Sequence, residues 1–292
     1  MEEQSKWLLA WLNEDKAIVA LLGPASVPGE ELGHLRRKWQ EAKAALMRRH
    51  PYRQTTRTLS PFQGKLKERA TAYQQRPDVV HALQGLDWGI GNVDLRWLLS
   101  FRWSVIEQDA VKRAEVIAPN DPDSLFSFCL PEYGQGLRVA SRIDADRKAI
   151  TFRSLDPKLG IGLPLVADVE VSPGPGEAGR TEKFMGFPVH FGVPFIQVVE
   201  FRGRLFLKDG YHRCYGLLRR SIHKIPCVCI RARDLAETGA AETGSIPYDI
   251  LFGDRPPYVS DFLDDSVSQA VTRVAQTKMV RVTAAEFAVE LL

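Results

Sequence analysis

The stretch of sequence that decides the fold runs from Gly192 to Arg231 and reads GVPFIQVVEFRGRLFLKDGYHRCYGLLRRSIHKIPCVCIR. Its apolar residues from Phe195 to Val199 predict a strand. Arg202-Gly203 then predicts a tight turn, and the residues from Arg204 to Lys208 predict a second short strand. We therefore expect a hairpin in this part of the chain.

A helix is predicted directly after this hairpin. Asp209-Gly210 interrupts the second strand, and apolar residues recur at helical spacing from Tyr211 to Ser221. Ile225-Pro226 opens a last strand. The glycine lets the backbone turn sharply and exposes the first helical N–H groups, which attract an anion. This strand-to-helix connection, the Asp-Gly corner (residues 208–213), therefore predicts a phosphate site.

Several side chains near the Asp-Gly corner suit phosphate chemistry. His212 and Arg213 lie in the first helical turn, and a forked guanidinium matches phosphate oxygens. Arg220 lies on the same helix face as Arg213, with Gly216 between them leaving room for close approach. Asp209 could bind Mg²⁺ or act as a general base, or it could cap the helix. The predicted phosphate or nucleotide site comprises Lys208, Gly210, Tyr211, His212, Arg213 and Arg220, and the predicted catalytic residues are Asp209 and His212.

Three motifs in this stretch, taken in order, resemble the ParB/sulfiredoxin-like superfamily. They are Gly192–Val198 (GVPFIQV), Asp209–Arg213 (DGYHR) and Ile225–Val228 (IPCV). The resemblance covers about residues 185–235 and implies an α/β core in which the loop and helix at 210–213 hold nucleotide phosphates. Members of this superfamily bind CTP and DNA, use ATP, or are nucleases. The resemblance therefore implies a nucleoside triphosphate and Mg²⁺ as possible cofactors.

The residue after the glycine departs from the superfamily pattern. Tyr211 stands where sulfiredoxin has its catalytic cysteine and where partition proteins have an acidic residue, so we do not expect sulfinic-acid reduction. Three functions stay open. The first is binding of a nucleotide, DNA or RNA at the Asp-Gly corner. The second is a metal-dependent nuclease or phosphoryl-transfer enzyme, and the third is a non-catalytic interaction scaffold.

Basic residues are concentrated between His34 and Arg76, where 12 Lys and Arg face two Glu, although the whole chain has a formal net charge of only +3. This asymmetry suggests a polyanionic partner. Alternatively, a basic helix docks on an acidic region of the same chain, since residues 232–292 have 10 acids and 5 bases. Asp261, Asp264 and Asp265 in that region could bind a cation or favour a helix start. The candidate nucleic-acid-binding residues are Arg36, Arg37, Lys38, Arg48 and Arg49.

The fold class expected from these patterns is α+β. Residues 1–118 are predicted to form a helical, partly basic region, and residues 119–292 an α/β region that contains the core at 185–235. Helices are predicted over 7–22, 28–50, 61–75, 78–86 and 95–117, the last capped by Asp94. Strands are predicted over 137–143, 149–153, 165–171 and 280–282, with an exposed loop at 172–179 and a last helix after Thr283.

The composition is that of a folded globular protein, with 45% hydrophobic and 26% charged residues, and it excludes global disorder and fibrous classes. No apolar run approaches the roughly 20 residues that span a bilayer, so we expect no membrane partner and a cytoplasmic location. The cysteines are too few for a disulfide scaffold, and core packing explains them better than a metal site. They are Cys129, Cys214, Cys227 and Cys229.

Overall fold

The chain divides into two compact units in a computed structural model. Unit 1 consists of Met1–Tyr133 and Pro194–Ala275, and unit 2 consists of Gly134–Val193 and Gln276–Leu292. The boundary predicted at residue 118 therefore lies inside unit 1. The structure describes residues 2–22, 29–53, 59–118, 121–131, 140–146, 148–154, 159–171, 180–187, 189–190, 195–240, 245–275 and 278–283.

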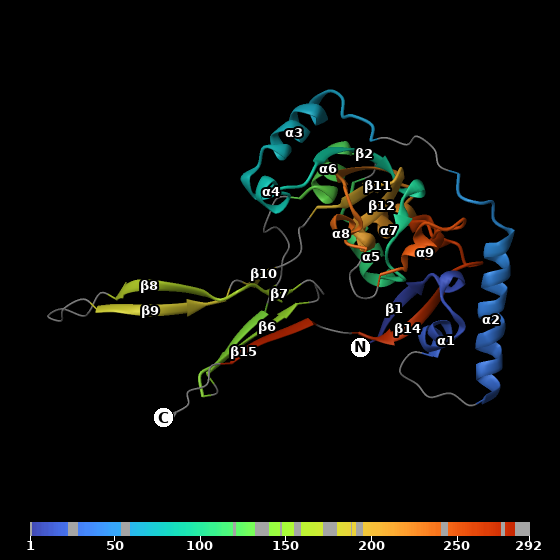
Figure 1. Cartoon of the computed structure of the whole chain (residues 1–292), viewed down its shortest axis with the longest axis horizontal. Coiled ribbons are helices and arrows are strands. Elements are labelled where there is room, and N and C mark those ends of the chain that lie inside the picture. The colour runs from blue at the N-terminus through green and yellow to red at the C-terminus, as the bar shows by residue number, and fades with distance from the viewer. Residues whose placement is uncertain are drawn as a thin grey trace. The chain divides into compact units, whose positions relative to one another are not determined.

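Unit 1 is an α+β structure built on a five-stranded mixed sheet (Figure 1). The strands of this sheet lie in the order β2 (Trp88–Asp94), β13 (Lys224–Arg231), β11 (Gln197–Phe201), β12 (Arg204–Asp209) and β3 (Leu99–Ser100). Strand β11 runs parallel to β13 and antiparallel to β12. Both of the parallel strands are deeply buried, because helices and loops cover the sheet. The hairpin and the last strand predicted between residues 195 and 231 are confirmed.

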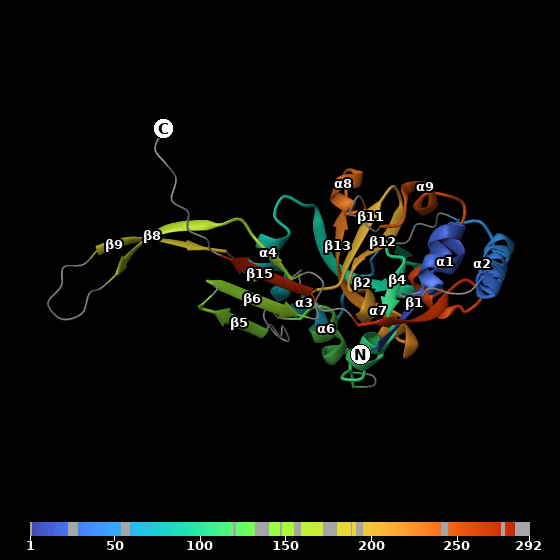
Figure 2. The same ribbon diagram turned by 90° about the horizontal axis from the view of Figure 1, so that it is seen from below.

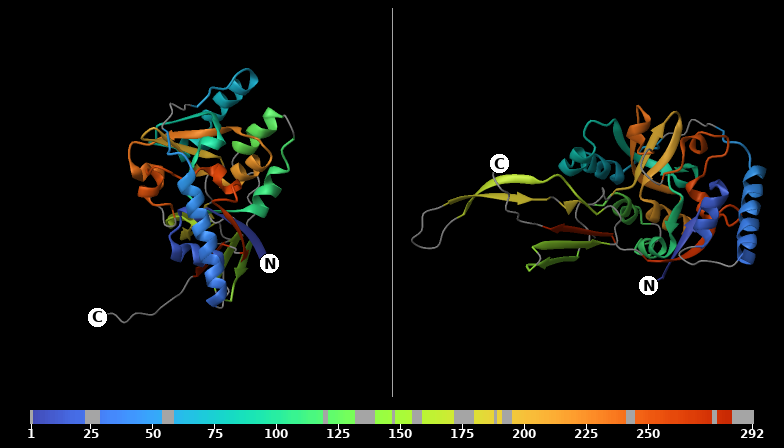
Figure 3. Two further views of the ribbon diagram at one scale, coloured as in Figure 1. Left: turned by 90° about the vertical axis from the view of Figure 1, so that its right-hand side faces the viewer. Right: turned by 60° about the horizontal axis from the view of Figure 1, so that its bottom comes forward.

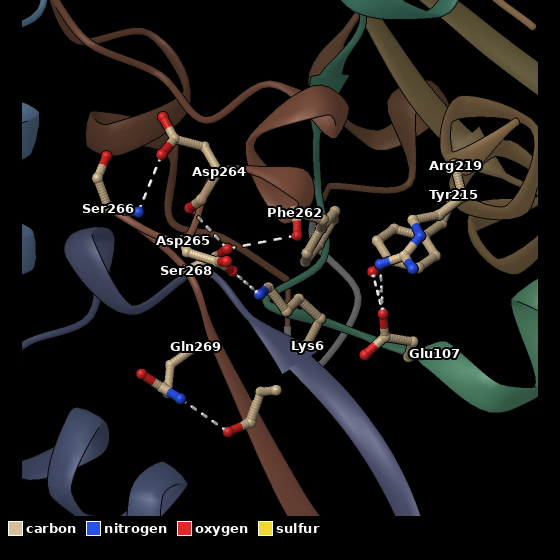
Figure 4. A network of polar contacts seen from close by, with 11 residues as sticks. Lys6, Glu107, Tyr215, Arg219, Phe262, Asp264, Asp265, Ser266, Ser268 and Gln269 are labelled. Atoms are coloured by element: carbon tan, nitrogen blue, oxygen red, sulfur yellow. Dashed lines mark hydrogen bonds and ion pairs between the residues drawn. The ribbon is translucent and has the colours of Figure 1, made fainter. Parts of the chain in front are cut away.

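Helix α7 (Tyr211–Arg219) connects β12 to β13 and packs against α5 (Glu107–Ala114). Two of its side chains bond one carboxylate of α5. The Tyr215 hydroxyl donates to Glu107 at 2.8 Å, and Arg219 donates to the same oxygen at 2.9 Å (Figure 4). Helix α6 (Pro122–Cys129) contacts β13. The helix predicted from Tyr211 is confirmed and is fixed on the sheet by these contacts.

A second sheet of unit 1 has the order β14 (Gln269–Val274), β1 (Glu2–Trp7) and β4 (Ser104–Ile106). Helix α1 (Glu14–Leu22) lies between this sheet and α2 (Gly29–Arg48), as Figures 1 and 2 show. The helix predicted over 7–22 is therefore only partly correct. Its first residue ends a strand, and a 3-10 helix, η1 (Leu9–Trp11), precedes α1, because β1 has ladder partners far away in the sequence.

The single helix predicted over 95–117 is also wrong. Asp94 does act as an N-cap, since its carboxylate accepts the Arg96 N–H at 3.0 Å, but it caps only the 3-10 helix η2 (Leu95–Trp97). Strands β3 and β4 follow, and helix begins again at α5. The apolar run is divided because β3 pairs with β12 and β4 pairs with β1, so each piece is buried in a different sheet.

The remaining elements of unit 1 are short. The predicted helices over 28–50, 61–75 and 78–86 correspond to α2, α3 (Lys65–Gln74) and α4 (Pro77–Ala82). Three further helical turns follow β13 along the chain. They are α8 (Leu235–Thr238), α9 (Tyr248–Leu251) and η3 (Val259–Leu263). Every helix in the described part of the chain is too short or too polar to cross a membrane.

Unit 2 consists of antiparallel strands (Figure 3). One sheet has the order β15 (Lys278–Thr283), β6 (Ala149–Ser154) and β5 (Ala140–Asp144). The other described strands of this unit form two separate two-stranded sheets. The predicted strands of this region are confirmed, whereas the loop at 172–179 and the helix after Thr283 lie outside the described residues. The two pairs are β7 (Gly160–Ile161) with β10 (Val189–His190), and β8 (Leu165–Val171) with β9 (Arg180–Gly186).

Candidate functional site

The Asp-Gly corner forms where the sequence predicts it. Gly210 has φ +96°, a left-handed conformation that favours glycine, and an added Cβ would lie 2.8 Å from Cγ1 of Ile196. The Asp209 carboxylate accepts the Gly210 N–H at 2.7 Å. Both the conformation and the packing therefore require glycine at this position. The tight approach of Ile196 also shows that the corner is closely packed against its own chain.

Tyr211 points into the protein and not toward a ligand. Its hydroxyl donates to the Leu207 carbonyl and accepts the Phe101 N–H at 2.7 Å. Burial raises the pKa of this phenol well above its ordinary value. We therefore correct the role predicted for Tyr211, because both hydrogen-bonding capacities of its hydroxyl join β12 to the loop after β3.

The two arginines of the predicted cationic strip bond to helix ends. Arg213 donates to the Phe128 carbonyl of α6 at 3.2 Å. Arg220 donates to the carbonyl of Ala114, the last residue of α5, and also to the Ile117 carbonyl three residues later, at 2.9 Å. Carbonyl groups at a helix C-terminus lack intrahelical donors and carry partial negative charge. The two guanidinium groups that the sequence predicts to bind phosphate therefore bind carbonyl groups of the protein itself.

The other residues of the corner are similarly engaged. The Lys208 ammonium donates to the Glu237 carbonyl of α8 at 2.9 Å, and His212 is half-buried in the first turn of α7. The close approach predicted at Gly216 is made by a helix, since an added Cβ would overlap the Ala110 carbonyl oxygen of α5. No group of three or more His, Cys, Asp or Glu able to hold a metal occurs among the described residues, and the Mg²⁺ role of Asp209 stays a prediction.

All four cysteines are buried and reduced, which agrees with their expected place in the core. Burial raises the pKa of Cys129 and of Cys229 to about 12, and it raises the pKa of the other two thiols as well. Thiols in this state are poor nucleophiles and poor metal ligands. They contribute packing to the sheet and to the helices on it.

Helix α2 divides its cations between internal ion pairs and the surface. Arg49, directly after α2, binds Asp261 at 2.8 Å and Asp264 at 2.6 Å, and Arg36 binds Glu14 at 2.9 Å. Arg49 therefore follows the alternative of a basic helix docked on acids of its own chain. By contrast, four cations of α2 have no acidic partner in the described part of the chain. They are Arg37, Lys38, Lys43 and Arg48, and the Lys43 ammonium lies over the Trp39 ring.

The acids in η3 and directly after it, Asp261, Asp264 and Asp265, each pair with a cation of the same chain. Asp261 is buried, and burial raises the pKa of its carboxyl to about 6 despite the neighbouring Arg49. Asp265 pairs with the buried Lys6 of β1, and the Ser268 hydroxyl donates to the Asp264 carbonyl at 2.8 Å (Figure 4). This network ties α2 and β1 to the chain that follows η3.

An open cavity of about 600 Å³ lies at the opposite end of β11 from the Asp-Gly corner. In the hairpin, Gln197 pairs with Asp209 at one end, whereas Phe201 pairs with Arg204 at the other. Residues that follow the carboxyl ends of β11 and β13 line the cavity, together with Tyr248 of α9. We call it the strand-end groove, and its principal side chains are Phe201, Arg202, Arg233, Asp234, Leu235 and Tyr248.

This groove is not predicted from the sequence. One local signal exists, because Arg202-Gly203 places an arginine at a turn position that favours asparagine or glycine. Nothing in the sequence indicates that Tyr248 joins it. A second cavity, of about 290 Å³, lies between α2 and residues 265–269, and its lining includes Lys38 and Arg48 as well as two acids.

Comparisons with known proteins add no relative to this description. The chain matches none of the protein-family models, curated proteins or solved structures with which it was compared. The resemblance of residues 185–235 to the ParB/sulfiredoxin-like superfamily therefore stays a prediction, and the functional argument depends on the geometry alone.

Proposed function

We propose that this chain binds nucleic acid through the basic face of α2, defined as Arg36, Arg37, Lys38 and Arg48. The observation that carries the proposal is that three of these cations lack an acidic partner within the described residues. Arg37 and Arg48 are exposed and Lys38 is half-buried. Cations without partners favour a polyanion, because each phosphate contact releases condensed counterions. Arg49 is not included, because its guanidinium holds two carboxylates of the same chain.

The spacing of the cations favours a polymer over a single phosphate. Arg37 and Arg48 are separated by three helical turns and both are exposed. At 1.5 Å per residue this separation is about 16 Å. Successive phosphates of one strand are about 3.4 Å apart along a duplex axis, so the two arginines span several of them. A mononucleotide could not reach both.

The Asp-Gly corner has no part in this proposal. Arg213 of this corner and the nearby Arg220 already bond to the ends of α6 and α5, and displacing them would leave these carbonyl groups without donors. No feature of Asp209 favours the nuclease alternative over the binding function. The third alternative, a scaffold without any anionic ligand, is decided by the experiment below.

Fluorescence anisotropy with a 20-base-pair DNA duplex and a single-stranded RNA of equal length, at 50 and 200 mM salt, tests the proposal. We expect binding that weakens with salt. The triple variant Arg37→Gln/Lys38→Gln/Arg48→Gln should reduce the slope of log affinity against log salt by about 3 and weaken binding at least about tenfold.

The control variant removes the same charge from other exposed positions, as Lys112→Gln/Arg142→Gln/Arg153→Gln. It should retain most of the affinity. The proposal is wrong if neither nucleic acid binds at 50 mM salt, or if both triple variants lose affinity equally. The first of these results would favour the scaffold.

A further inference from the structure

We propose that the strand-end groove binds a small organic anion that carries a planar ring, with Arg202 as the anion contact and Tyr248 beside the ring. This site is separate from the basic face of α2 and does not depend on it. A volume of about 600 Å³ is within the range of small-molecule sites. Four properties of the groove support the assignment.

The first property is the position of the groove in the sheet. Strands β11 and β13 are neighbours and run parallel, so their carboxyl ends meet at one edge. The Ala232 N–H donates to the Glu200 carbonyl at 2.9 Å and extends this ladder to the rim of the groove. Beyond this ladder the two segments separate. The segment after β11 enters the Arg202-Gly203 turn, and the segment after β13 continues to α8. Crevices at the carboxyl ends of parallel strands are the usual ligand sites of such sheets.

The second property is the backbone of Arg202. Its φ is +50° and that of Gly203 is +71°, so both turn residues are left-handed, as a two-residue hairpin of this type requires. Asparagine or glycine adopts this conformation with less strain than arginine. Arginine is therefore not the residue that the turn itself selects. Strained positions of this kind occur most often where the side chain has a function.

The third property is the charge of Arg202. The guanidinium donates to the Tyr248 hydroxyl at 2.5 Å, and its centre lies 5.3 Å from the Phe201 ring centroid. In the described residues no carboxylate pairs with it, whereas Arg233 on the same rim pairs with Glu237. Two aromatic side chains thus hold the Arg202 guanidinium in place without neutralising it. A forked cation fixed in this way suits a carboxylate or a phosphate.

The fourth property is the mixed lining. Tyr248 is 41% exposed, and Phe252 stacks against its ring with the centroids 4.4 Å apart. Phe201 and Leu235 add apolar surface, and Asp234 adds acceptor oxygens at the rim. Inorganic anions would leave this apolar lining in contact with water. A ring that carries the anionic group would cover it and gain the burial of apolar surface.

The test is a thermal-shift measurement on the full chain with four probes: adenosine monophosphate, benzoate, inorganic phosphate and adenosine. We expect a ring-bearing anion to raise Tm by about 2 °C or more, since ligand binding to the folded state stabilises it. Phosphate alone and adenosine alone should each have a smaller effect. Adenosine monophosphate and benzoate distinguish a phosphate from a carboxylate ligand.

The decisive variant is Arg202→Asn. Asparagine is the better turn residue, so Tm without a probe should be unchanged or higher, while the shift caused by the ring-bearing anion should be lost. Arg142→Gln, an exposed arginine of β5, is the control and should keep the shift. The assignment is wrong if no ring-bearing anion shifts Tm, if phosphate alone is as effective, or if Arg202→Asn keeps the shift. The triple variant of α2 should respond to the probes like the wild type.

Discussion

At the scale of single residues, arginine side chains of this protein repeatedly bind carbonyl groups at helix ends. Carbonyls of the last helical turn have no donors within their own helix and form the negative end of its dipole. An arginine from a distant segment supplies donors in each case. The acceptors lie in the last turn of a helix or directly after it. The ends of α1, α2, α5, α6 and α9 are bound, respectively, by Arg273, Arg255, Arg220, Arg213 and Arg204.

This use of arginine explains why the sequence overstates the cations available to a ligand. Arg213 and Arg220 have the spacing and chemistry of a phosphate site, and nothing local distinguishes them from one. Their acceptors in α6 and α5 are Phe128 and Ala114, which precede them by 85 and 106 residues. Only the tertiary structure reveals that competition. Cations of α2 can be assigned to a surface role only after their internal partners are known.

Asp261 gives a prediction at the same scale, concerning pH. Burial raises the pKa of its carboxyl from 3.8 to about 6 in the folded state. A group with a raised pKa contributes stability that is present below pH 3.8 and is lost as pH rises through about 6. One pKa unit corresponds to about 1.4 kcal/mol, so the loss amounts to about 3 kcal/mol. Asp261→Asn cannot titrate and should avoid this loss.

The measurement is urea unfolding of the wild type and Asp261→Asn at pH 4, 5, 6 and 7. The free energy of unfolding of the variant, relative to the wild type, should increase as pH rises across this range. Asp249→Asn changes an exposed carboxylate that pairs with no cation in the described part of the chain, and it provides the baseline for the same comparison. A difference between Asp261→Asn and the wild type that stays constant with pH would contradict the prediction.

At the scale of elements, the sequence predicts well where local pattern and tertiary pairing agree. The hairpin of β11 and β12 joins neighbouring segments, and Asp209-Gly210 marks the start of α7, so this region is correct. The prediction fails where the pairing is distant. Glu2–Trp7 pairs with β14 near the end of unit 1, and no local pattern specifies that partner. The strand-end groove is not predicted for the same reason, since it depends on a contact between Arg202 and Tyr248 of α9, which are 46 residues apart in the sequence.

Gly216 gives a prediction about the contact between α7 and α5. Alanine is the better helix residue, but its Cβ would overlap the Ala110 carbonyl oxygen and lie 2.8 Å from Ala114 Cβ. The backbone of α5 cannot shift without disturbing the sheet of β14, β1 and β4, because α5 packs against β1 and β4. Gly216→Ala should therefore lower the free energy of unfolding by about 1–3 kcal/mol, as overpacking does. Urea unfolding measures this loss.

A second glycine provides the matched control. Gly33 lies within α2, and the nearest atom to an added Cβ is the end of the Arg37 side chain at 3.9 Å. Gly33→Ala should leave stability unchanged or raise it by up to about 1 kcal/mol, because only helix propensity is altered. If the two substitutions changed stability alike, α5 and α7 could not be packed as closely as described.

At the scale of the whole molecule, unit 2 consists of a segment inserted in unit 1, residues 134–193, and of residues 276–292, which follow unit 1. The chain leaves unit 1 after α6 and returns just before β11, and the Ile196 N–H donates to the Cys129 carbonyl at 2.9 Å. The residues of unit 1 that flank the inserted segment are therefore neighbours, which is the usual geometry of an insertion. Unit 1 can bury its central strands irrespective of the structure of unit 2. The two units should consequently differ in stability.

Hydrogen exchange measured by mass spectrometry tests this difference on two pairs of strands. β8 and β9 pair only with each other among the described strands, and a two-stranded ribbon is marginally stable in water. Leu165 and Phe184 on this ribbon are 61% and 57% exposed, so little packing opposes its opening. β11 and β13 are buried between other strands and open only with unit 1 as a whole. Amides of the ribbon should exchange at least about 100-fold faster than those of β11 and β13. Equal protection would contradict the prediction and would mean that another surface covers Leu165 and Phe184 in solution. If the exchange rate then depended on protein concentration, that surface would belong to a second copy of the chain.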